Sequence, residues 1–142
     1  MKKTNLSVLL LSILIFQACS NREPAAAPAA EEAEAIARTE FTDRIENYFE
    51  YEPLHSAKPS QVRIHLTDLS DGSPVEQAEV TLIVRLRGSP DAIMQTVSRV
   101  GKVTGIYVAD LAIPKPGDYD IEFHIKNSKL DERLPLSNFK VE

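Results

Sequence analysis

The sequence of 142 residues predicts an all-β fold, an immunoglobulin-like β-sandwich of about seven antiparallel strands that follows a signal peptide and a disordered tether. Three observations predict it. Apolar residues alternate with polar ones in several segments after residue 39, turn residues separate these segments, and no sustained helical period occurs there. A small open barrel is the alternative arrangement of the same strands.

The first eighteen residues have the pattern of an export signal. Lys2 and Lys3 precede an apolar run over residues 6–16, which is shorter than the roughly 20 residues that span a bilayer. The run ends before Ala18 and Cys19, the one cysteine of the chain. This arrangement resembles the bacterial lipoprotein signal, which implies cleavage after residue 18 and a lipid anchor on Cys19 with acyl chains such as palmitate. Ordinary cleavage that leaves a free thiol is the alternative.

The segment behind the cysteine has the composition of a tether. Residues 19–38 are rich in Ala, Pro and Glu and contain one strong hydrophobe, Ile36, so they cannot bury enough apolar surface to offset the entropy of ordering. A partner-binding Ala/Pro segment is the alternative. Ser20 stands where Asp often signals retention in the inner membrane. We therefore expect a cell-envelope protein that faces the periplasm, with the outer membrane favoured over the inner.

The folded domain is expected over residues 39–142. Strict alternation predicts strands at 61–66, 80–87 and 119–126, because one side of each strand is apolar and the other polar. Weaker patterns predict further strands at 43–51, 92–100, 105–113 and 132–141. Turn residues at 58–60, 71–74, 88–91 and 115–118 separate them.

Two details refine this assignment. Tyr119 follows a Pro-Gly-Asp turn at the start of the penultimate strand, where sandwiches of this class often have a tyrosine that hydrogen-bonds back across a corner. Arg85 and Arg87 lie on a strand expected beside that one, where they are positioned to pair with Asp120 and Glu122.

Composition excludes several function classes. The formal net charge of −5 argues against a nucleic-acid partner, which usually needs a basic surface. The sequence has no G-x-S-x-G, H-E-x-x-H, C-x-x-C or P-loop motif, and its serines after residue 39 stand mostly in turn contexts. We therefore expect no enzyme activity, no resident cofactor and no small-molecule substrate.

An ordered series of short motifs begins at Thr39. It runs through Thr39–Asp43, Glu46–Leu54, Lys58–Ser60, Ile64–Leu69 and Pro74–Val75. The series resembles the extra N-terminal domain of some periplasmic adaptor subunits of heavy-metal RND efflux pumps, over about residues 39–82. Because 142 residues leave no room for the adaptor's hairpin, lipoyl-like and barrel domains, the resemblance implies a free-standing copy of this accessory domain, with a pump component as its partner.

The pump resemblance makes metal binding the sharpest chemical hypothesis. Zinc and copper sites need several imidazole, sulfur or carboxylate ligands around one ion. Glu50 and His65 lie on the first two predicted strands, which are expected to pair, so they are the candidate metal ligands. The alternative is an exposed carboxylate–imidazole pair. His65 and His124 are expected on opposite sheets.

The strand over 105–113 is apolar on both sides, and this indicates a partner contact. Ile106 and Val108 form its second apolar side, and Ile83 is also expected to point outward. A terminal strand or the tether covering that side is the alternative. The sequence thus leads to two hypotheses: an accessory binding module of a heavy-metal efflux system, or a generic immunoglobulin-like structural or interaction lipoprotein with no metal role.

Overall fold

A computed structural model describes residues 34–142 of the chain, which belong to one compact unit. The predicted signal peptide, the predicted lipid-attachment residue Cys19 and residues 20–33 of the predicted tether lie outside the described residues. The described part contains no helix, and hence none long and apolar enough to cross a membrane. Its strands are β1 (Ile36–Phe41), β2 (Ile45–Tyr51), β3 (Ser60–Asp68), β4 (Glu79–Leu86), β5 (Ala92–Val97), β6 (Arg99–Val100), β7 (Ile106–Leu111), β8 (Gly117–Lys126) and β9 (Asp131–Val141).

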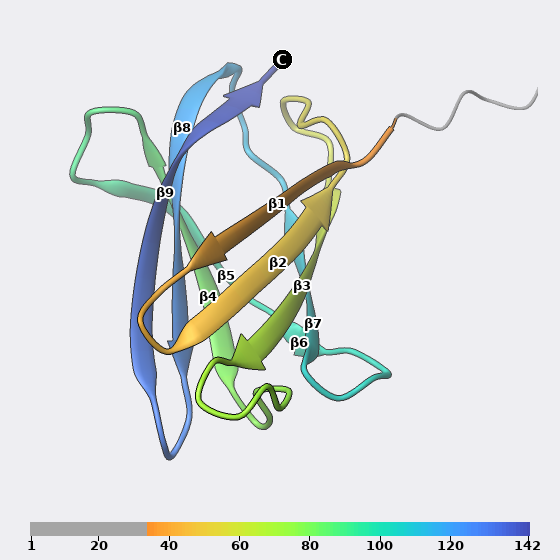
Figure 1. Cartoon of the computed structure of the whole chain (residues 1–142). Helices are drawn as coiled ribbons and strands as arrows, with labels where there is room; N and C mark the ends of the chain where they lie inside the picture. Colours follow the sequence, from red (N-terminus) through yellow and green to blue (C-terminus); the bar gives the residue numbers. More distant parts are fainter. Residues whose placement is uncertain (1–33) are drawn as a thin grey trace, which may run out of the picture. The chain divides into compact units, whose positions relative to one another are not determined.

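The strands form two antiparallel sheets packed face to face (Figure 1). The five-stranded sheet has the order β1-β2-β3-β7-β6, and the four-stranded sheet has the order β5-β4-β8-β9. Strands β2-β3-β7-β6 opposite β4-β8-β9 reproduce the A-B-E-D and C-F-G order of the immunoglobulin fold. The predicted sandwich is confirmed. Over residues 34–142 the two sheets are separate and each has two edge strands, so the open barrel is wrong.

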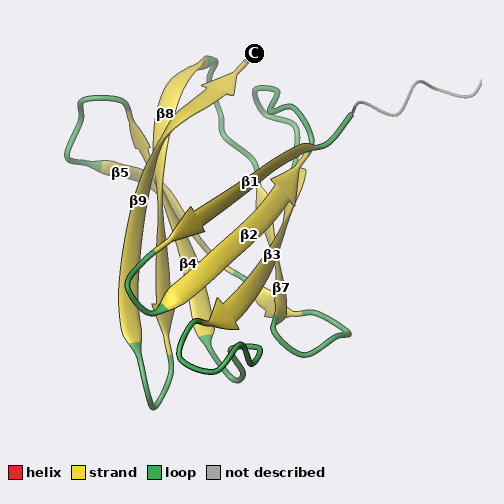
Figure 2. Cartoon of the chain, in the orientation of Figure 1, coloured by secondary structure: helices red, strands yellow, loops and turns green. Residues whose placement is uncertain are grey.

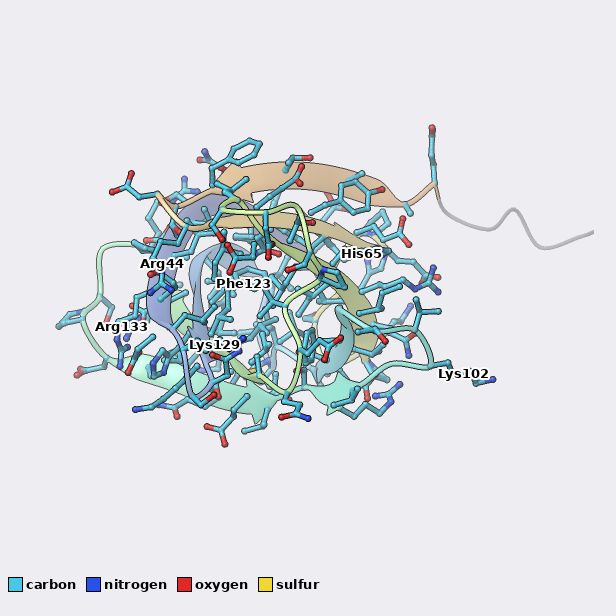
Figure 3. The ribbon with its side chains drawn as sticks, turned by 60° about the horizontal axis from the view of Figure 1, so that its bottom comes forward. Arg44, His65, Lys102, Phe123, Lys129 and Arg133 are labelled. Carbon is cyan, nitrogen blue, oxygen red and sulfur yellow. The ribbon has the colours of Figure 1, made fainter. Side chains whose placement is uncertain are left out.

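The core lies between the two sheets, where the alternation of the sequence directs the apolar side chains. Phe49 of β2, Phe123 of β8 and Phe139 of β9 are all buried, and the rings of Phe49 and Phe123 lie 4.8 Å apart. Figure 3 shows Phe123 in the interior of the domain. These aromatic rings join the two sheets in a chain that has no tryptophan.

Two tyrosine hydroxyls fix the corners of the sandwich. The Tyr119 hydroxyl donates to the Lys115 carbonyl at 2.9 Å, so the predicted tyrosine corner is confirmed. The buried Tyr107 hydroxyl donates to the Val75 carbonyl at 2.8 Å and accepts from the Ala78 amide at 3.0 Å. Tyr107 therefore holds the long β3–β4 connection against β7.

Strand β1 differs from the sequence prediction. Residues 36–38 were expected in the tether, but they pair with β2, so the regular structure begins three residues before the predicted domain start at residue 39. The reason is a set of distant contacts. The Arg38 guanidinium donates to the Ser137 carbonyl of β9 at 3.0 Å and lies 4.8 Å from the centre of the Phe139 ring. No side chain of β1 is fully buried, so the strand has no apolar alternation to reveal it.

The predicted strand at 92–100 is two strands. β5 pairs with β4 in one sheet, and the Ser98 amide donates to the Val80 carbonyl at 2.8 Å as the last bond to that sheet. The next residue, Arg99, pairs with Val108 of β7 in the other sheet. The chain thus changes sheets at Ser98–Arg99, with neither Gly nor Pro to mark the change. In Figure 2, β5 lies with β4 in one sheet and β7 with β3 in the other.

Candidate interaction surface

The residues singled out in the sequence lie together on one side of the molecule. Strand register forms two rows across β2, β3 and β7: Tyr48, His65 and Ile106 in one, and Glu50, Arg63 and Val108 in the next. All six side chains point away from the core, because their chain neighbours Asn47, Phe49, Ile64 and Tyr107 are buried. We call these six residues, with Gln61 and Asp110, the outer face of the five-stranded sheet.

Glu50 is paired with an arginine. Its carboxylate accepts from Nη1 of Arg63 at 2.8 Å and lies 3.3 Å from the Tyr48 hydroxyl. The register places Arg63 directly opposite Glu50, and Tyr48 opposite His65. The prediction of a direct Glu50–His65 cross-strand pair is therefore wrong, and the two residues are diagonal neighbours. Strand period determines the side of a residue, whereas a shift of the register by two residues leaves every side unchanged, so the sequence could not choose between these partners.

His65 is half-buried between the aromatic ring of Tyr48 and Ile106. The His65 and Tyr48 rings meet edge to face, with centroids 5.2 Å apart and planes at 79°. The Nε2 atom of His65 is buried and has no hydrogen-bond partner among the described residues. A polar atom in this position costs stability unless a partner group reaches it.

Ile106 and Val108 are half-exposed, so this side of β7 presents apolar surface. A nearby turn extends it: the Ile106 amide donates to the Val103 carbonyl at 3.1 Å, and the Val103 side chain is largely exposed. Strand β1 pairs with β2 at the sheet edge and does not cover these residues, which answers the alternative of a covering terminal strand for the part of the chain described. An ion pair of Arg99 with Asp110, at 2.7 Å, borders the apolar surface.

The remaining histidines lie elsewhere. His124 is on β8 of the four-stranded sheet and bonds to Asp131 at 2.7 Å, so His65 and His124 are on opposite sheets as expected. His55 is exposed in the connection between β2 and β3. Over residues 34–142, no three His, Cys, Asp or Glu side chains converge in a group able to hold a metal ion. The metal-ligand role of Glu50 and His65 stays a prediction.

Ion-paired side chains cover part of the outer face of the four-stranded sheet. Glu122 pairs with Arg85 at 3.4 Å and with Arg133 at 2.6 Å, and Arg87 lies 3.9 Å from Asp120. The predicted pairing of Arg85 and Arg87 with Asp120 and Glu122 is thus confirmed. Ile83 points outward as expected, but it is only 7% exposed, so it adds no apolar surface.

A hollow lies where β1 approaches β9. Its volume is about 600 Å³, and Ile36, Arg38, Tyr51, Leu54 and Lys140 are among the residues that line it. Burial raises the pKa of the Tyr51 hydroxyl, and the nearby Arg38 guanidinium partly offsets this shift. The charged groups of the hollow are paired within the chain, Arg38 with Glu40 and Lys140 with Glu142, so it offers no free charge to a ligand.

Sequence reasoning did not single out four residues of the outer face: Tyr48, Gln61, Arg63 and Asp110. Tyr48 and Arg63 have the same alternation as Glu50 and His65, so period alone would have placed them on the same side. The residue types gave no sign of the contacts, because those depend on register.

Searches against known protein families, curated proteins and solved structures return no match to this chain.

Proposed function

We propose that this protein is a non-enzymatic lipoprotein of the bacterial envelope and an accessory binding module of a heavy-metal RND efflux system. It docks on a protein component of the pump through the outer face of the five-stranded sheet. The proposal draws on the lipoprotein-like signal at Cys19 and on the adaptor-like motifs of residues 39–82. The resemblance covers β1, β2, β3 and the start of β4, and β2 and β3 supply five of the eight residues of the docking surface.

The observation that carries the proposal is the half-exposed apolar surface of Ile106 and Val108 beside Tyr48 and His65. Aromatic residues beside aliphatic ones are typical of the centre of a protein interface, with charged pairs at the rim. Here the pairs Glu50–Arg63 and Arg99–Asp110 occupy that rim. A partner that fits is a folded protein whose contact surface has an apolar centre for Ile106 and Val108 and polar groups around it.

Membrane attachment sets where such a partner is met. Acyl chains on Cys19 anchor the chain, and residues 20–35 reach about 50 Å when fully extended, at ~3.3 Å per residue. The sandwich is thereby held in the periplasm within reach of an envelope pump, with the outer membrane as the favoured site of anchoring.

Binding to the pump adaptor tests this proposal. The full chain is titrated with the purified adaptor subunit of the heavy-metal RND pump from the same cell. Val108→Glu should weaken binding by at least about tenfold, because it places a charge in the apolar centre of the contact. Leu69→Glu is the control, since Leu69 is an exposed apolar residue in the β3–β4 connection, outside the outer face of the five-stranded sheet. Equal affinities of the two variants, or no binding by the unchanged protein, would contradict the proposal.

The Glu50–Arg63 ion pair favours a second candidate, a generic immunoglobulin-like structural or interaction lipoprotein with no metal role. A metal ligand must be free to leave its other partners, and the Glu50 carboxylate is already held at 2.8 Å. Calorimetric titration with zinc, cobalt, nickel and monovalent copper separates the candidates. Micromolar binding that is lost in His65→Ala would make Glu50 and His65 a ligand pair, whereas flat traces for every metal would leave docking alone.

A further inference from the structure

Within residues 34–142 the two sheets have four edge strands, and three of them carry features that oppose pairing with another chain. β1 places the charged side chains of Arg38 and Glu40 along its edge. β9 contains Pro135 and a register shift near Asn138, whose φ is 72°. β6 has two residues. Charges, proline, bulges and short length are the devices by which natural sheets avoid edge-to-edge association.

β5 is the exception among these four. Its sequence AIMQTV has no charged residue and no proline. Two of its hydrophobic side chains are exposed, Ile93 at 44% and Val97 at 61%. An uncharged edge with exposed β-branched side chains is a surface suited to pairing with another strand.

The backbone of β5 has free hydrogen-bonding groups along its edge away from β4, at Gln95 and Val97. The Ser98 amide bonds to Val80 of β4, so it points into the sheet. Peptide groups alternate in direction along a strand, so those of Val97 and Gln95 point away from β4 to the free edge. The register shift between Val84 and Arg85 makes Ile93 the extra residue of a bulge, which leaves Met94–Val97 as the regular part.

We infer that β5 pairs with β5 of a second copy of this chain, antiparallel and about a twofold axis at Gln95. This register sets Gln95 opposite Gln95 of the second copy as a hydrogen-bonded pair, because both backbones present their free groups there. It also sets the exposed side chains of Ile93 and Val97 opposite Val97 and Ile93 of the second copy. The pairing joins the two four-stranded sheets into one.

Because β5 has no charged residue, β5 of a second copy can pair with it without like charges meeting. A twofold axis brings each residue near its own counterpart, so any charge close to the axis would meet a like charge. Residues 92–97 carry none. An axis at Met94 or Thr96 would instead oppose an apolar side chain to the Gln95 amide. The surface is small, so the dimer is weak and forms where copies are concentrated.

Disulfide trapping in whole cells that express the full chain tests this pairing. Gln95→Cys places its thiol opposite its own counterpart, where the expected Cα separation of about 5.5 Å is within disulfide reach. Oxidation should give a covalent dimer in large excess over the unchanged protein, which reports any background from Cys19. Thr96→Cys, whose counterpart lies off the axis, and Ser128→Cys, an exposed loop position, are the controls. They should remain at background.

A second variant confirms the surface. In the Gln95→Cys background, Val97→Lys sets a charge against Ile93 of the second copy and should lower the dimer yield by about tenfold. Leu69→Lys in the same background should leave it unchanged. A Gln95→Cys yield no higher than that of Ser128→Cys, a yield indifferent to Val97→Lys, or a disulfide to a different protein would overturn the inference.

Discussion

The outer faces of the two sheets are built on the same alternating pattern, yet they are closed in different ways. On the four-stranded sheet, Glu122 forms ion pairs with both Arg85 and Arg133. Ile83, which lies opposite Glu122, is buried. On the five-stranded sheet, charged pairs lie beside Ile106 and Val108 and leave them half-exposed. An outward apolar residue therefore becomes part of the fold on one sheet and part of a surface on the other.

The neighbours across the strands produce this difference. Ile83 has Glu122 on one side and Gln95 on the other, and the long Arg85 side chain reaches Glu122 above it. Val108 has Arg63 and Arg99 as its neighbours, and each of these arginines turns to an acid, Glu50 or Asp110. The stems of long side chains cover apolar surface only where their charged ends are drawn across it.

The largest expected effect is the difference in stability lost on truncating the buried Ile83 and the half-exposed Val108. Ile83→Ala should lower the free energy of unfolding by about 2–4 kcal/mol, because it leaves a cavity under the ion-pair layer. Val108→Ala should cost below about 1 kcal/mol, since its side chain is half in water. Urea denaturation of the full chain measures both. Equal losses would show that the two outer faces are packed alike and would remove the contrast.

Ion pairs give the next largest contrast. Glu122 bonds to two arginines and its side chain is 15% exposed, so Glu122→Gln should cost about 1–2 kcal/mol. Glu50 has one arginine and its own side chain is 29% exposed, so Glu50→Gln should cost about 0–1 kcal/mol. Denaturation at low and high salt gives the comparison. A greater loss from Glu50→Gln than from Glu122→Gln would contradict this prediction, because the more stabilising ion pair would then lie on the five-stranded sheet.

Replacing a buried amide on the inner side of the five-stranded sheet should increase the stability of the protein. Asn47 is fully buried, and neither polar atom of its side chain has a hydrogen-bond partner among the described residues. Asn47→Leu is similar in size and should raise the free energy of unfolding by about 1 kcal/mol, because it removes the desolvation cost. Leu66→Asn, at the position opposite on β3, is the reverse change and should destabilise. A loss of stability in Asn47→Leu would assign the amide a structural role.

The sequence predicted the side of a residue far better than its partners. Alternation placed Val62, Ile64 and Leu66 in the core and left Glu50, His65, Ile106 and Val108 outside, as the structure has them. It could not pair Glu50 with Arg63, because registers two residues apart bury the same side chains.

Long-range contacts account for the other differences. β1 is held by backbone pairing with β2 and by Arg38, which bonds to a carbonyl 99 residues away. No local pattern contains that information. The change of sheet at Ser98 likewise depends on where β4 and β7 lie, and not on the residues at the change.

The smallest expected effect is the pH dependence of stability that arises from the His124–Asp131 pair, near one end of β8 and β9. Hydrogen bonds from His124 and Lys126 hold the pKa of Asp131 below its ordinary value of 3.8. Because the folded protein binds this proton less readily than the unfolded chain, the carboxylate stabilises the fold above pH 3.8. That contribution is lost as the pH falls through the lower pKa of the folded state. Asp131→Asn removes it, so the urea midpoint should fall less between pH 6 and pH 3 in the variant than in the unchanged protein. An equal fall in both would mean that the His124–Asp131 contact does not bias the fold. Of these two sets of contacts on the four-stranded sheet, only the ion pairs of Glu122 with Arg85 and Arg133 would then stabilise the fold.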